Sequence, residues 1–522
     1  MRWFLLALLF VAPAAKAEPA HAVHQMVASA HPLASQAGLD VLRDGGSAID
    51  AAVAVALVLS VVEPQASGLG GGGLMLAWDA AAGQLHYYEG VSAAPAGVGA
   101  ALLTPDEVGK PAAFAIARSG RAAGVPGEVA MLALAQARYG KLPWARLVEP
   151  AARIAEQGFP MPRELNTVLS RSPEAFAAVP ALRALYFDID GAPLATGTTL
   201  HNPDQARALK LIAQQGPTAL YEGPVGDAVI EAAKSSPYPG SITAADLANY
   251  KAQERAALCA VVFAHRVCTA APPASGGVAV LQQLGLLERL DYTRLGFGSS
   301  QAIHLLLEAS RLATADRRRW VADPDQRDVP TEGLVNPGYL DGRAALVSEQ
   351  RAMERAPAGE PPRRHGALPP EAESLILAGT SHVSIIDAAG DAVAMTVTNN
   401  LNFGARVAPL GFTLNNGLSN FAANPDAQNA MAPGRRPATT MAPTIVFGAD
   451  GRPEIVAGAG GGAWIVDAVA AGLAEMLTHG ADPQAAVALP RVGAQMAILF
   501  SKKTRRSPTR PRRCGRWGIS CA

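Results

Sequence analysis

The sequence predicts an α+β protein in which helices and strands pack in layers. Residues 128–355 have a mostly helical pattern, whereas the chain from Thr380 onward contains short apolar strands separated by glycine-containing turns. Helices followed by strands along one chain are typical of this class. Apolar residues make up 49% of the 522 residues and charged residues 17%, which excludes a disordered chain and a coiled coil.

The N-terminus has the pattern of an export signal over residues 1–17. Arg2 precedes an apolar run, and Ala15-Lys16-Ala17 forms a cleavage site of the A-x-A type before Glu18. The run is too short to span a bilayer. We therefore expect a secreted, periplasmic protein with no membrane anchor after signal cleavage.

The first elements expected after the signal are a buried helix and a strand. Ser47 caps a predicted helix over residues 48–62, which ends at Glu63-Pro64. A glycine-rich stretch, 67–73, then leads into a strand over 74–78. A phosphate-binding loop is not indicated, because no Gly-Lys-Ser/Thr follows and the strand comes after the glycines. A close crossing of two backbone segments is the better interpretation.

The second half of the chain contains the other strand signals. We expect a flexible surface segment over 355–372, then strands over 383–387 and 392–398 joined by the turn 388–391. Two further strands are expected over residues 444–447 and 454–457.

Cys259 and Cys268 flank a predicted hairpin over residues 260–267. In an exported protein this pair is a reasonable disulfide, although two buried thiols remain an alternative.

The 44 basic and 44 acidic residues are unevenly distributed, because eight basic residues and no acidic residue fall in 501–522. The remaining chain is acidic, so no nucleic-acid partner is implied. This tail has no apolar periodicity, and we predict that it results from a shift of reading frame; a natural basic tail is the alternative. Resequencing the gene from about codon 490 tests this, since an unshifted read would refute it.

The chemistry has few candidate motifs. The sequence contains no G-x-S-x-G or H-E-x-x-H motif and no paired metal ligands. Catalysis by an N-terminal threonine, for which Thr380 is the candidate, needs no cofactor or metal. Thr380 follows Gly379 just before a strand. A threonine hydroxyl becomes a useful nucleophile when its own α-amine acts as the base, which requires cleavage of the chain before Thr380.

The chain closely resembles the γ-glutamyltransferase (glutathione hydrolase) family of N-terminal-nucleophile hydrolases from about residue 26 to residue 492. The segments that carry the resemblance are Met26-Val27-Ala28-Ser29-Ala30-His31-Pro32, Gly45-Gly46-Ser47-Ala48-Ile49-Asp50, Val62-Glu63-Pro64, Asp246-Leu247-Ala248-Asn249-Tyr250, Pro272-Pro273-Ala274-Ser275-Gly276-Gly277, Thr380-Ser381-His382, Asn415-Asn416, Arg436-Pro437-Ala438-Thr439-Thr440-Met441-Ala442-Pro443-Thr444 and Gly460-Gly461-Gly462.

The resemblance implies a four-layer αββα sandwich made from a precursor that cuts itself between Gly379 and Thr380. The large chain, 18–379, and the small chain, 380–522, would remain associated. Thr380 would be the nucleophile, Thr398 the threonine that hydrogen-bonds it, and Gly461 and Gly462 the oxyanion-hole glycines. The substrates would be a glutathione-like γ-glutamyl donor and water or an amine acceptor.

Substrate recognition departs from the family pattern. The position of the family's carboxylate-binding arginine is Val91, and the acidic partner of the substrate ammonium is replaced by Asn420. Gly417 occupies the family's Gln/Glu position. The remaining matches are Asn400, Thr439 and Thr440, the last two replacing paired serines. Arg118 and Arg121 are the nearest basic candidates that could compensate.

Three functions stay open at this stage. The first is a γ-glutamyltransferase or glutathione hydrolase with ordinary donors. The second is an amidase or acylase of the same fold for a different acyl group, which Val91, Gly417 and Asn420 favour. The third is a catalytically dead secreted homologue, against which Thr380, Thr398 and the glycine pair argue.

Overall fold

The computed structural model describes residues 18–103, 106–107, 111–296, 298–363, 368–371 and 379–494, and the backbone of 513–514 and 519–520. The predicted signal peptide lies outside these residues. The predicted frame-shifted tail does too, apart from the backbone of two short strands, β13 (Arg513–Cys514) and β14 (Ile519–Ser520).

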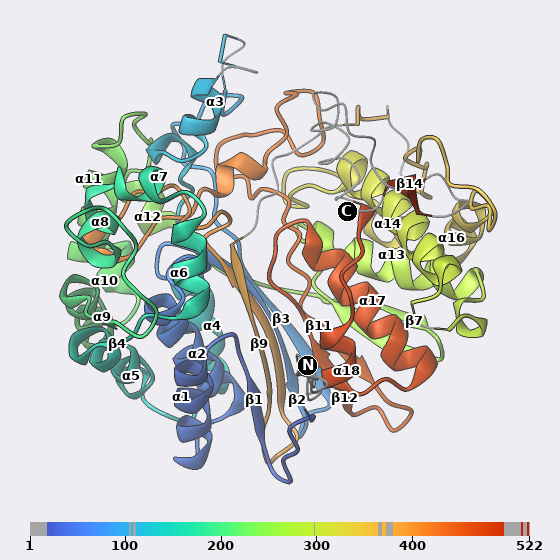
Figure 1. Cartoon of the computed structure of the whole chain (residues 1–522), viewed down its shortest axis with the longest axis horizontal. Helices are drawn as coiled ribbons and strands as arrows, with labels where there is room; N and C mark the ends of the chain where they lie inside the picture. The colour runs from blue at the N-terminus through green and yellow to red at the C-terminus, as the bar shows by residue number, and fades with distance from the viewer. Residues whose placement is uncertain are drawn as a thin grey trace, which may run out of the picture.

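A six-stranded antiparallel sheet runs through the centre of the molecule (Figure 1). Its order is β1 (Met26–Ala28), β9 (Thr380–Ile386), β10 (Ala392–Thr398), β2 (Gly72–Asp79), β3 (Gln84–Gly90) and β6 (Gln253–Arg255). The predicted strand pair is thus confirmed as β9 and β10, although β9 begins at Thr380 and not at Val383 as predicted. Because β9 lies between β1 and β10, strands from both ends of the sequence share this sheet.

A second antiparallel sheet packs against the first. Its order is β12 (Pro453–Ala457), β11 (Thr444–Phe447), β8 (His265–Thr269) and β7 (Leu258–Val262). Apolar side chains from the facing sides of the two sheets form one cluster, which includes Leu76, Trp78, Ile445 and Phe447. A further two-stranded pair joins β4 (Phe159–Pro160) and β5 (Thr199–Leu200).

The predicted disulfide between Cys259 and Cys268 is present. The two residues are directly opposite each other on β7 and β8. The hairpin turn is Phe263-Ala264, and both residues have positive φ (50° and 62°). Such a turn matches the right-handed twist of the strands it joins, which brings the two cysteines into register.

One group of helices covers the outer face of the six-stranded sheet, on the left of Figure 1. Their shared apolar cluster includes Val383 and Ile385 of β9. The group consists of α1 (Pro32–Arg43), α2 (Ala48–Val62), α4 (Glu128–Tyr139), α5 (Trp144–Gln157), α6 (Arg163–Ser170), α7 (Pro173–Ala177), α8 (Pro180–Tyr186), α9 (Pro203–Gln215), α10 (Thr218–Tyr221), α11 (Pro224–Lys234) and α12 (Ala244–Asn249). The predicted helix over 48–62 is α2, and every residue in it is buried.

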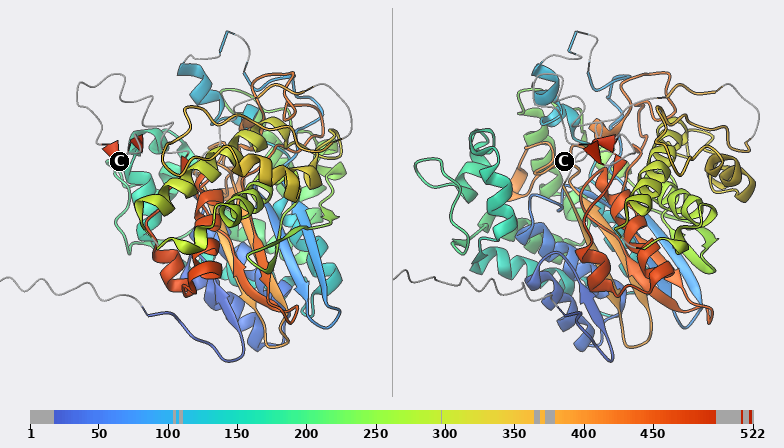
Figure 2. Two further views of the ribbon diagram at one scale, coloured as in Figure 1. Left: turned by 90° about the vertical axis from the view of Figure 1, so that its right-hand side faces the viewer. Right: turned by 45° about the vertical axis from the view of Figure 1, so that its right-hand side comes forward.

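A second group of helices covers the outer face of the four-stranded sheet, on the right of Figure 1 and in front in the left view of Figure 2. It consists of α13 (Ser275–Arg289), α14 (Ser300–Trp320), α15 (Thr331–Leu334), α16 (Pro337–Ala344) and α17 (Trp464–His479), with α18 (Pro483–Ala488) following. None of the described helices is long and apolar enough to cross a membrane. Together these elements confirm the mixed α+β class.

The smaller helices lie at the upper end of the molecule in Figure 1 or in connections. They are α3 (Pro111–Ile116), which projects from the body in Figures 1 and 2, and the 3-10 turns η1 (Gly120–Ala122), η2 (Tyr292–Arg294), η3 (Pro409–Gly411) and η4 (Gly417–Asn420).

Part of the segment predicted as a flexible surface loop, 355–372, is packed against the helices. The Gly359 amide donates to Asp316, and its carbonyl accepts from Trp320. Arg343 pairs with Asp316 at 3.0 Å and donates to the Pro357 carbonyl. The composition of the segment resembles that of a loop, but a buried carboxylate on α14 needs donors, and this backbone supplies one.

Candidate active site

Thr380 and Thr398 face each other where two strands meet. Thr380 begins β9, Thr398 ends β10, and the antiparallel register pairs the two residues directly. Their hydroxyl oxygens are 3.0 Å apart. The β-strand pairing thus creates the predicted contact between residues that are 18 positions apart in the sequence.

The Thr398 hydroxyl also contacts the peptide bond before Thr380. It donates to the Gly379 carbonyl at 2.5 Å and accepts from the Asn400 amide at 2.7 Å. A hydroxyl has one proton and two lone pairs. Since the Thr398 proton goes to the carbonyl, Thr380 must be the donor to Thr398, which leaves lone pairs of Thr380 Oγ1 free beside the Gly379 carbonyl.

Gly379 is held close to the backbone of the loop that follows β10. A Cβ at this position would lie 2.6 Å from the Leu401 carbonyl carbon and 2.7 Å from the Asn402 nitrogen. Only glycine allows this approach, so the residue before the nucleophile is determined by packing.

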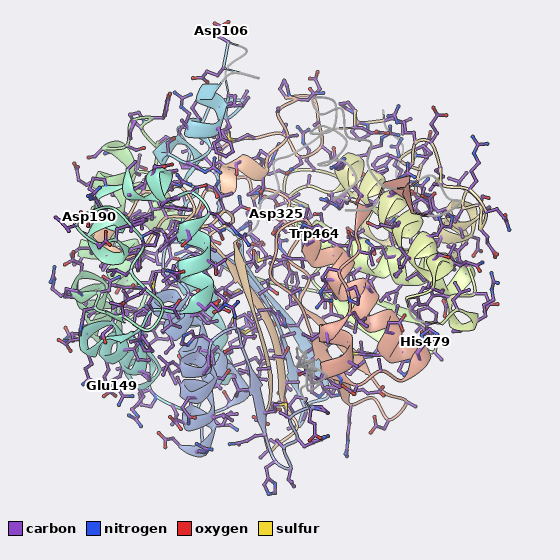
Figure 3. All side chains as sticks on the ribbon, viewed as in Figure 1. Asp106, Glu149, Asp190, Asp325, Trp464 and His479 are labelled. Atoms are coloured by element: carbon purple, nitrogen blue, oxygen red, sulfur yellow. A yellow bond between two sulfur atoms is a disulfide. The ribbon has the colours of Figure 1, made fainter. Side chains whose placement is uncertain are left out.

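The glycine segment 460–462 lies against Thr380. A Cβ on Gly460 would be 2.1 Å from the Thr380 carbonyl oxygen. Gly461 and Gly462 have positive φ (125° and 61°), and α17 begins just after them at Trp464, the central end of that helix in Figure 3. The amides at a helix N-terminus carry partial positive charge, which suits stabilisation of a developing oxyanion.

The residues after Thr380 are held by buried polar contacts. The Ser381 hydroxyl donates to Glu63 at 2.7 Å, and burial raises the pKa of this glutamate while the hydrogen bond opposes the shift. His382 contacts the hydroxyls of Thr396 and Ser384 at 2.9 and 3.0 Å. Burial lowers the pKa of His382 to about 3, so its imidazole is uncharged at neutral pH.

The predicted recognition residues line one cavity with Thr398. The lining residues are Gly72, Val91, Ser92, Thr398, Asn400, Asn415, Gly417, Asn420, Pro437, Thr439 and Met441. This set contains no charged side chain. Thr440 is not among them, because its hydroxyl donates to the Gly462 carbonyl at 2.9 Å and so supports the glycine segment.

Amides make up the polar wall of this cavity. The Asn400 side-chain amide donates to Asn416 and Ser419, and the buried Oδ1 of Asn420 has no hydrogen-bond partner among the described residues. An unpaired buried acceptor is costly, so Asn420 is suited to an N–H donor on a bound molecule.

Gly417 leaves room for its neighbour across the cavity. A Cβ on Gly417 would lie 2.1 Å from Ser92 Oγ. The family's longer side chain therefore does not fit at this position while Ser92 keeps its place.

A buried ionic cluster supports the wall that contains Val91. Glu89 is enclosed between Arg436 at 3.2 Å and Arg255 at 3.3 Å, and it also accepts from the Val91 amide at 2.8 Å. Burial raises the pKa of Glu89, and the two guanidinium groups oppose that shift. Asp325, labelled in Figure 3, completes the cluster by pairing with Arg255. Both arginines are therefore already engaged by acids.

The two basic candidates from the sequence have different environments. Arg121 is neutralised by Glu107, which accepts two hydrogen bonds of 3.0 Å from it. Arg118 forms no ion pair with a described residue, and neither does Arg406, which the sequence reasoning did not single out. Nothing in the sequence around Arg406 distinguishes it from other loop residues.

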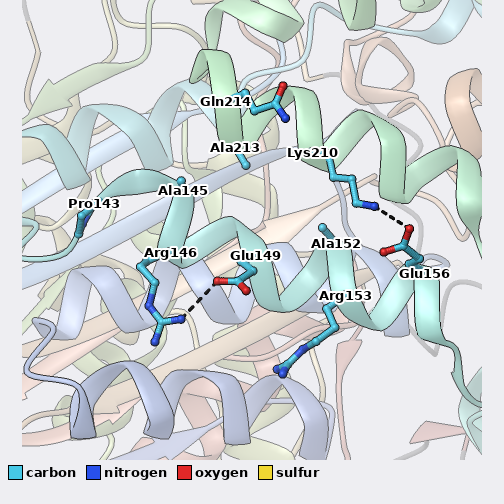
Figure 4. A pocket seen from close by; sticks show the side chains of 10 residues that line it. All are labelled: Pro143, Ala145, Arg146, Glu149, Ala152, Arg153, Glu156, Lys210, Ala213 and Gln214. Carbon is cyan, nitrogen blue, oxygen red and sulfur yellow. Dashed lines mark hydrogen bonds and ion pairs between the residues drawn. The ribbon is translucent and has the colours of Figure 1, made fainter.

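A larger hollow lies elsewhere, between α5 and α9 (Figure 4). Charged pairs line it, including Arg146 with Glu149 and Lys210 with Glu156. None of the site residues above lines it, so the cavity that includes Thr398, the partner of Thr380, remains the candidate active site.

The Gamma-glutamyltranspeptidase family matches residues 34–509, which includes the first part of the basic tail. A glutathione hydrolase proenzyme of Bacillus subtilis (strain 168) is 34% identical over 475 residues, covering 90% of this chain and 80% of the relative. The acylase ACY 1 proenzyme of Pseudomonas sp. (strain SE83) is 36% identical over 489 residues, covering 92% and 84%. A crystal structure of cephalosporin acylase from Bacillus halodurans has the same fold, with a TM-score of 0.75 at 24% identity over 95% of this chain and 92% of that one.

The fold and the paired threonines define an N-terminal-nucleophile enzyme. The chain belongs to the γ-glutamyltranspeptidase family and is an enzyme of the glutathione hydrolase type.

Proposed function

We propose that this protein is exported as a precursor, cuts itself before Thr380, and then transfers acyl groups from γ-glutamyl amides to water or amines. The observation that carries the proposal is the Thr398 hydroxyl, which contacts both Thr380 Oγ1 and the Gly379 carbonyl. A donor on that carbonyl oxygen favours attack on its carbon, because it stabilises the negative charge that develops there.

The cleavage step moves one acyl group from nitrogen to oxygen. Thr380 Oγ1 attacks the Gly379 carbonyl carbon and gives its proton to Thr398 Oγ1, which passes its own proton to the carbonyl oxygen, so that a neutral tetrahedral intermediate forms. Collapse of this intermediate breaks the carbon–nitrogen bond of the peptide, and the nitrogen takes a proton to become the α-amine of Thr380. Water then hydrolyses the ester, which releases the Gly379 carboxylate and the free Thr380 hydroxyl.

The mature reaction uses the same groups on a substrate. The new α-amine of Thr380 is the base for its own hydroxyl, with an ordinary pKa of about 7.7–8.0 that suits proton transfer near neutral pH. The acyl-enzyme forms as the donor's amine leaves, and water or a second amine releases the acyl group. Gly461 and Gly462 are proposed as the oxyanion site.

The proposal also covers the layered architecture of the fold and the association of the two chains that cleavage would produce. The helices, the two sheets and the second helix group would form a four-layer αββα sandwich, with chains 18–379 and 380–522 staying associated after cleavage. The signal 1–17 would direct the protein to the periplasm.

An acylase for a different acyl group is the second candidate, and the uncharged lining of the cavity favours it. A zwitterionic γ-glutamyl group needs partners for its two charges, and charge-assisted hydrogen bonds contribute roughly 1.5–3 kcal/mol each. Comparing kcat/KM for γ-glutamyl, glutaryl and unsubstituted acyl p-nitroanilides separates the candidates. Preference for the γ-glutamyl substrate supports the first, and preference for an acyl group without the ammonium supports the second.

The double variant Val91→Arg/Asn420→Asp is expected to raise kcat/KM for γ-glutamyl p-nitroanilide by at least tenfold. The new guanidinium and carboxylate would bind the donor's two charges, and both changes are needed because a single buried charge is unfavourable. Each single variant is the control and should gain less. A double variant that is folded, self-cleaved and no faster than wild type would show that the cavity recognises its donor differently.

A further inference from the structure

Two arginines on segments that adjoin the candidate active site, Arg118 and Arg406, have no acidic partner among the described residues. The Nε atom of each is also buried without a hydrogen bond to a described residue. By contrast, Arg255 and Arg436, in the ionic cluster that supports the wall containing Val91, are held by carboxylates. A charge is rarely left half-buried and unpaired unless something else compensates it.

Arg118 is connected to the nucleophile through a short chain of contacts. The carbonyl of the residue before it, Ala117, accepts from the Asn416 side chain at 2.8 Å. The Asn416 side chain in turn accepts from the Asn400 side chain at 3.2 Å. The backbone N–H of Asn400 donates to the Thr398 hydroxyl. The turn η1, which follows Arg118, packs against η4, which carries Gly417 and Asn420. The segment that carries Arg118 therefore lies beside the amide wall of the cavity.

Arg406 is on the same loop as Asn400 and Asn416, between β10 and η4. Its backbone is left-handed, with φ of 55°, and its side chain stacks over the Phe176 ring at 4.3 Å. The Phe176 ring packs against Phe403 at 5.4 Å, and Arg406 donates to the Ala175 carbonyl at 2.7 Å. An L-residue adopts such a backbone conformation at a cost, so the surroundings hold this guanidinium in place.

Both side chains are fixed on one face and leave donors available. Arg118 stacks over Phe114 at 3.3 Å and donates to the Phe114 carbonyl at 3.2 Å. A guanidinium has five N–H donors, and each of these groups uses one for a main-chain carbonyl. The remaining planar donors match the geometry of a carboxylate.

The two charges also repel each other. Burial, together with the neighbouring charge of Arg406, lowers the pKa of Arg118 to about 10, and burial lowers the pKa of Arg406 as well. With a pKa of about 10, Arg118 remains cationic at neutral pH. An anion between them would relieve this repulsion, whereas no described acid does so.

We propose that Arg118 and Arg406 together bind a carboxylate of the substrate, in place of the arginine that the family carries at the position of Val91. The inference rests on the proposed acyl transfer. The carboxylate belongs either to the acyl donor or to the amine acceptor, and both sources are recognised by the same guanidinium chemistry.

The test uses substrate pairs that differ only in one carboxylate. For the donor, glutaryl p-nitroanilide is compared with its terminal carboxamide; for the acceptor, glycylglycine is compared with glycylglycinamide. Arg118→Gln and Arg406→Gln are each expected to lower the preference for the charged member of one pair by about 10- to 100-fold in kcat/KM, the range for one charge-assisted interaction. Arg121→Gln is the matched control, since Glu107 already neutralises that residue, and it should keep the wild-type preference.

Calorimetric binding of glutarate to the same proteins provides a readout without turnover. We expect both variants, but not Arg121→Gln, to bind glutarate at least tenfold more weakly than wild type. A loss confined to the donor pair or to the acceptor pair supports the site and assigns the carboxylate. Unchanged preferences and unchanged glutarate affinity in both variants would overturn the inference. Arginine-dependent glutarate binding without hydrolysis of any anilide would instead refute the proposed function and leave the anion site standing.

Discussion

Purified Thr380→Ala protein is expected to remain a single chain, whereas the wild type separates into fragments 18–379 and 380–522. The substitution removes the hydroxyl of the residue directly after Gly379, which is within hydrogen-bond distance of Thr398 Oγ1. The expected effect is complete loss of cleavage and of amide hydrolysis, since the same oxygen serves both steps. Denaturing gels and intact mass measurement give the result directly.

Thr380→Ser is the matched control for this experiment. It keeps the hydroxyl and loses only a methyl group, so it should still cleave. Wild-type protein that is folded and soluble yet stays uncut would contradict the assignment of Thr380 as nucleophile.

Thr398→Val should slow self-cleavage by about 10²–10³-fold, the range measured for loss of one oxyanion donor. Valine has nearly the shape of threonine but cannot donate to the Gly379 carbonyl or accept the Thr380 proton, both of which the Thr398 hydroxyl is placed to do. The rate is measured from fragment appearance on gels over time.

Thr398→Ser is expected to cleave at a rate close to that of the wild type. Circular dichroism before the time course ensures that the valine variant is folded. If Thr398→Val matured as fast as the wild type, the hydroxyl would have no part in the reaction, and another group would have to polarise the carbonyl.

Local patterns in the sequence predicted the elements that carry the nucleophile. The cap at Ser47 and the break at Glu63-Pro64 place α2 where the structure has it. Alternating residues and the turn 388–391 predict the β9–β10 pair, and once the pair is formed its register brings Thr380 opposite Thr398. The disulfide follows in the same way from a short hairpin with cysteines at opposite ends. These features depend on neighbours close in sequence.

The cavity could be predicted only in part, because its walls come from distant segments. Sequence comparison indicated Val91, Gly417 and Asn420 as departures, but not that Gly417 accommodates Ser92 or that Thr440 supports Gly462. Arg118 and Arg121 look equivalent in the sequence, and only the position of Glu107 distinguishes them. The position of Arg406 could not be predicted from the sequence, because it depends on the left-handed backbone of this loop residue and on the Phe176 ring of α7.

The order of strands in the two sheets has a consequence for the matured protein. Strands β9 and β10 of the later fragment are inserted between β1 and β2 of the earlier one, and β11 of the later fragment pairs with β8 of the earlier one. If the chain is cut before Thr380, separating the fragments would break three strand pairings, β1–β9, β10–β2 and β11–β8, and would divide both sheets. Dilution should therefore not reduce activity, and a mixture of isotope-labelled and unlabelled matured protein should form no hybrid pairs on the timescale of catalysis. The severed peptide bond would then alter the chemistry at Thr380 without giving the molecule a second, independently folding partner.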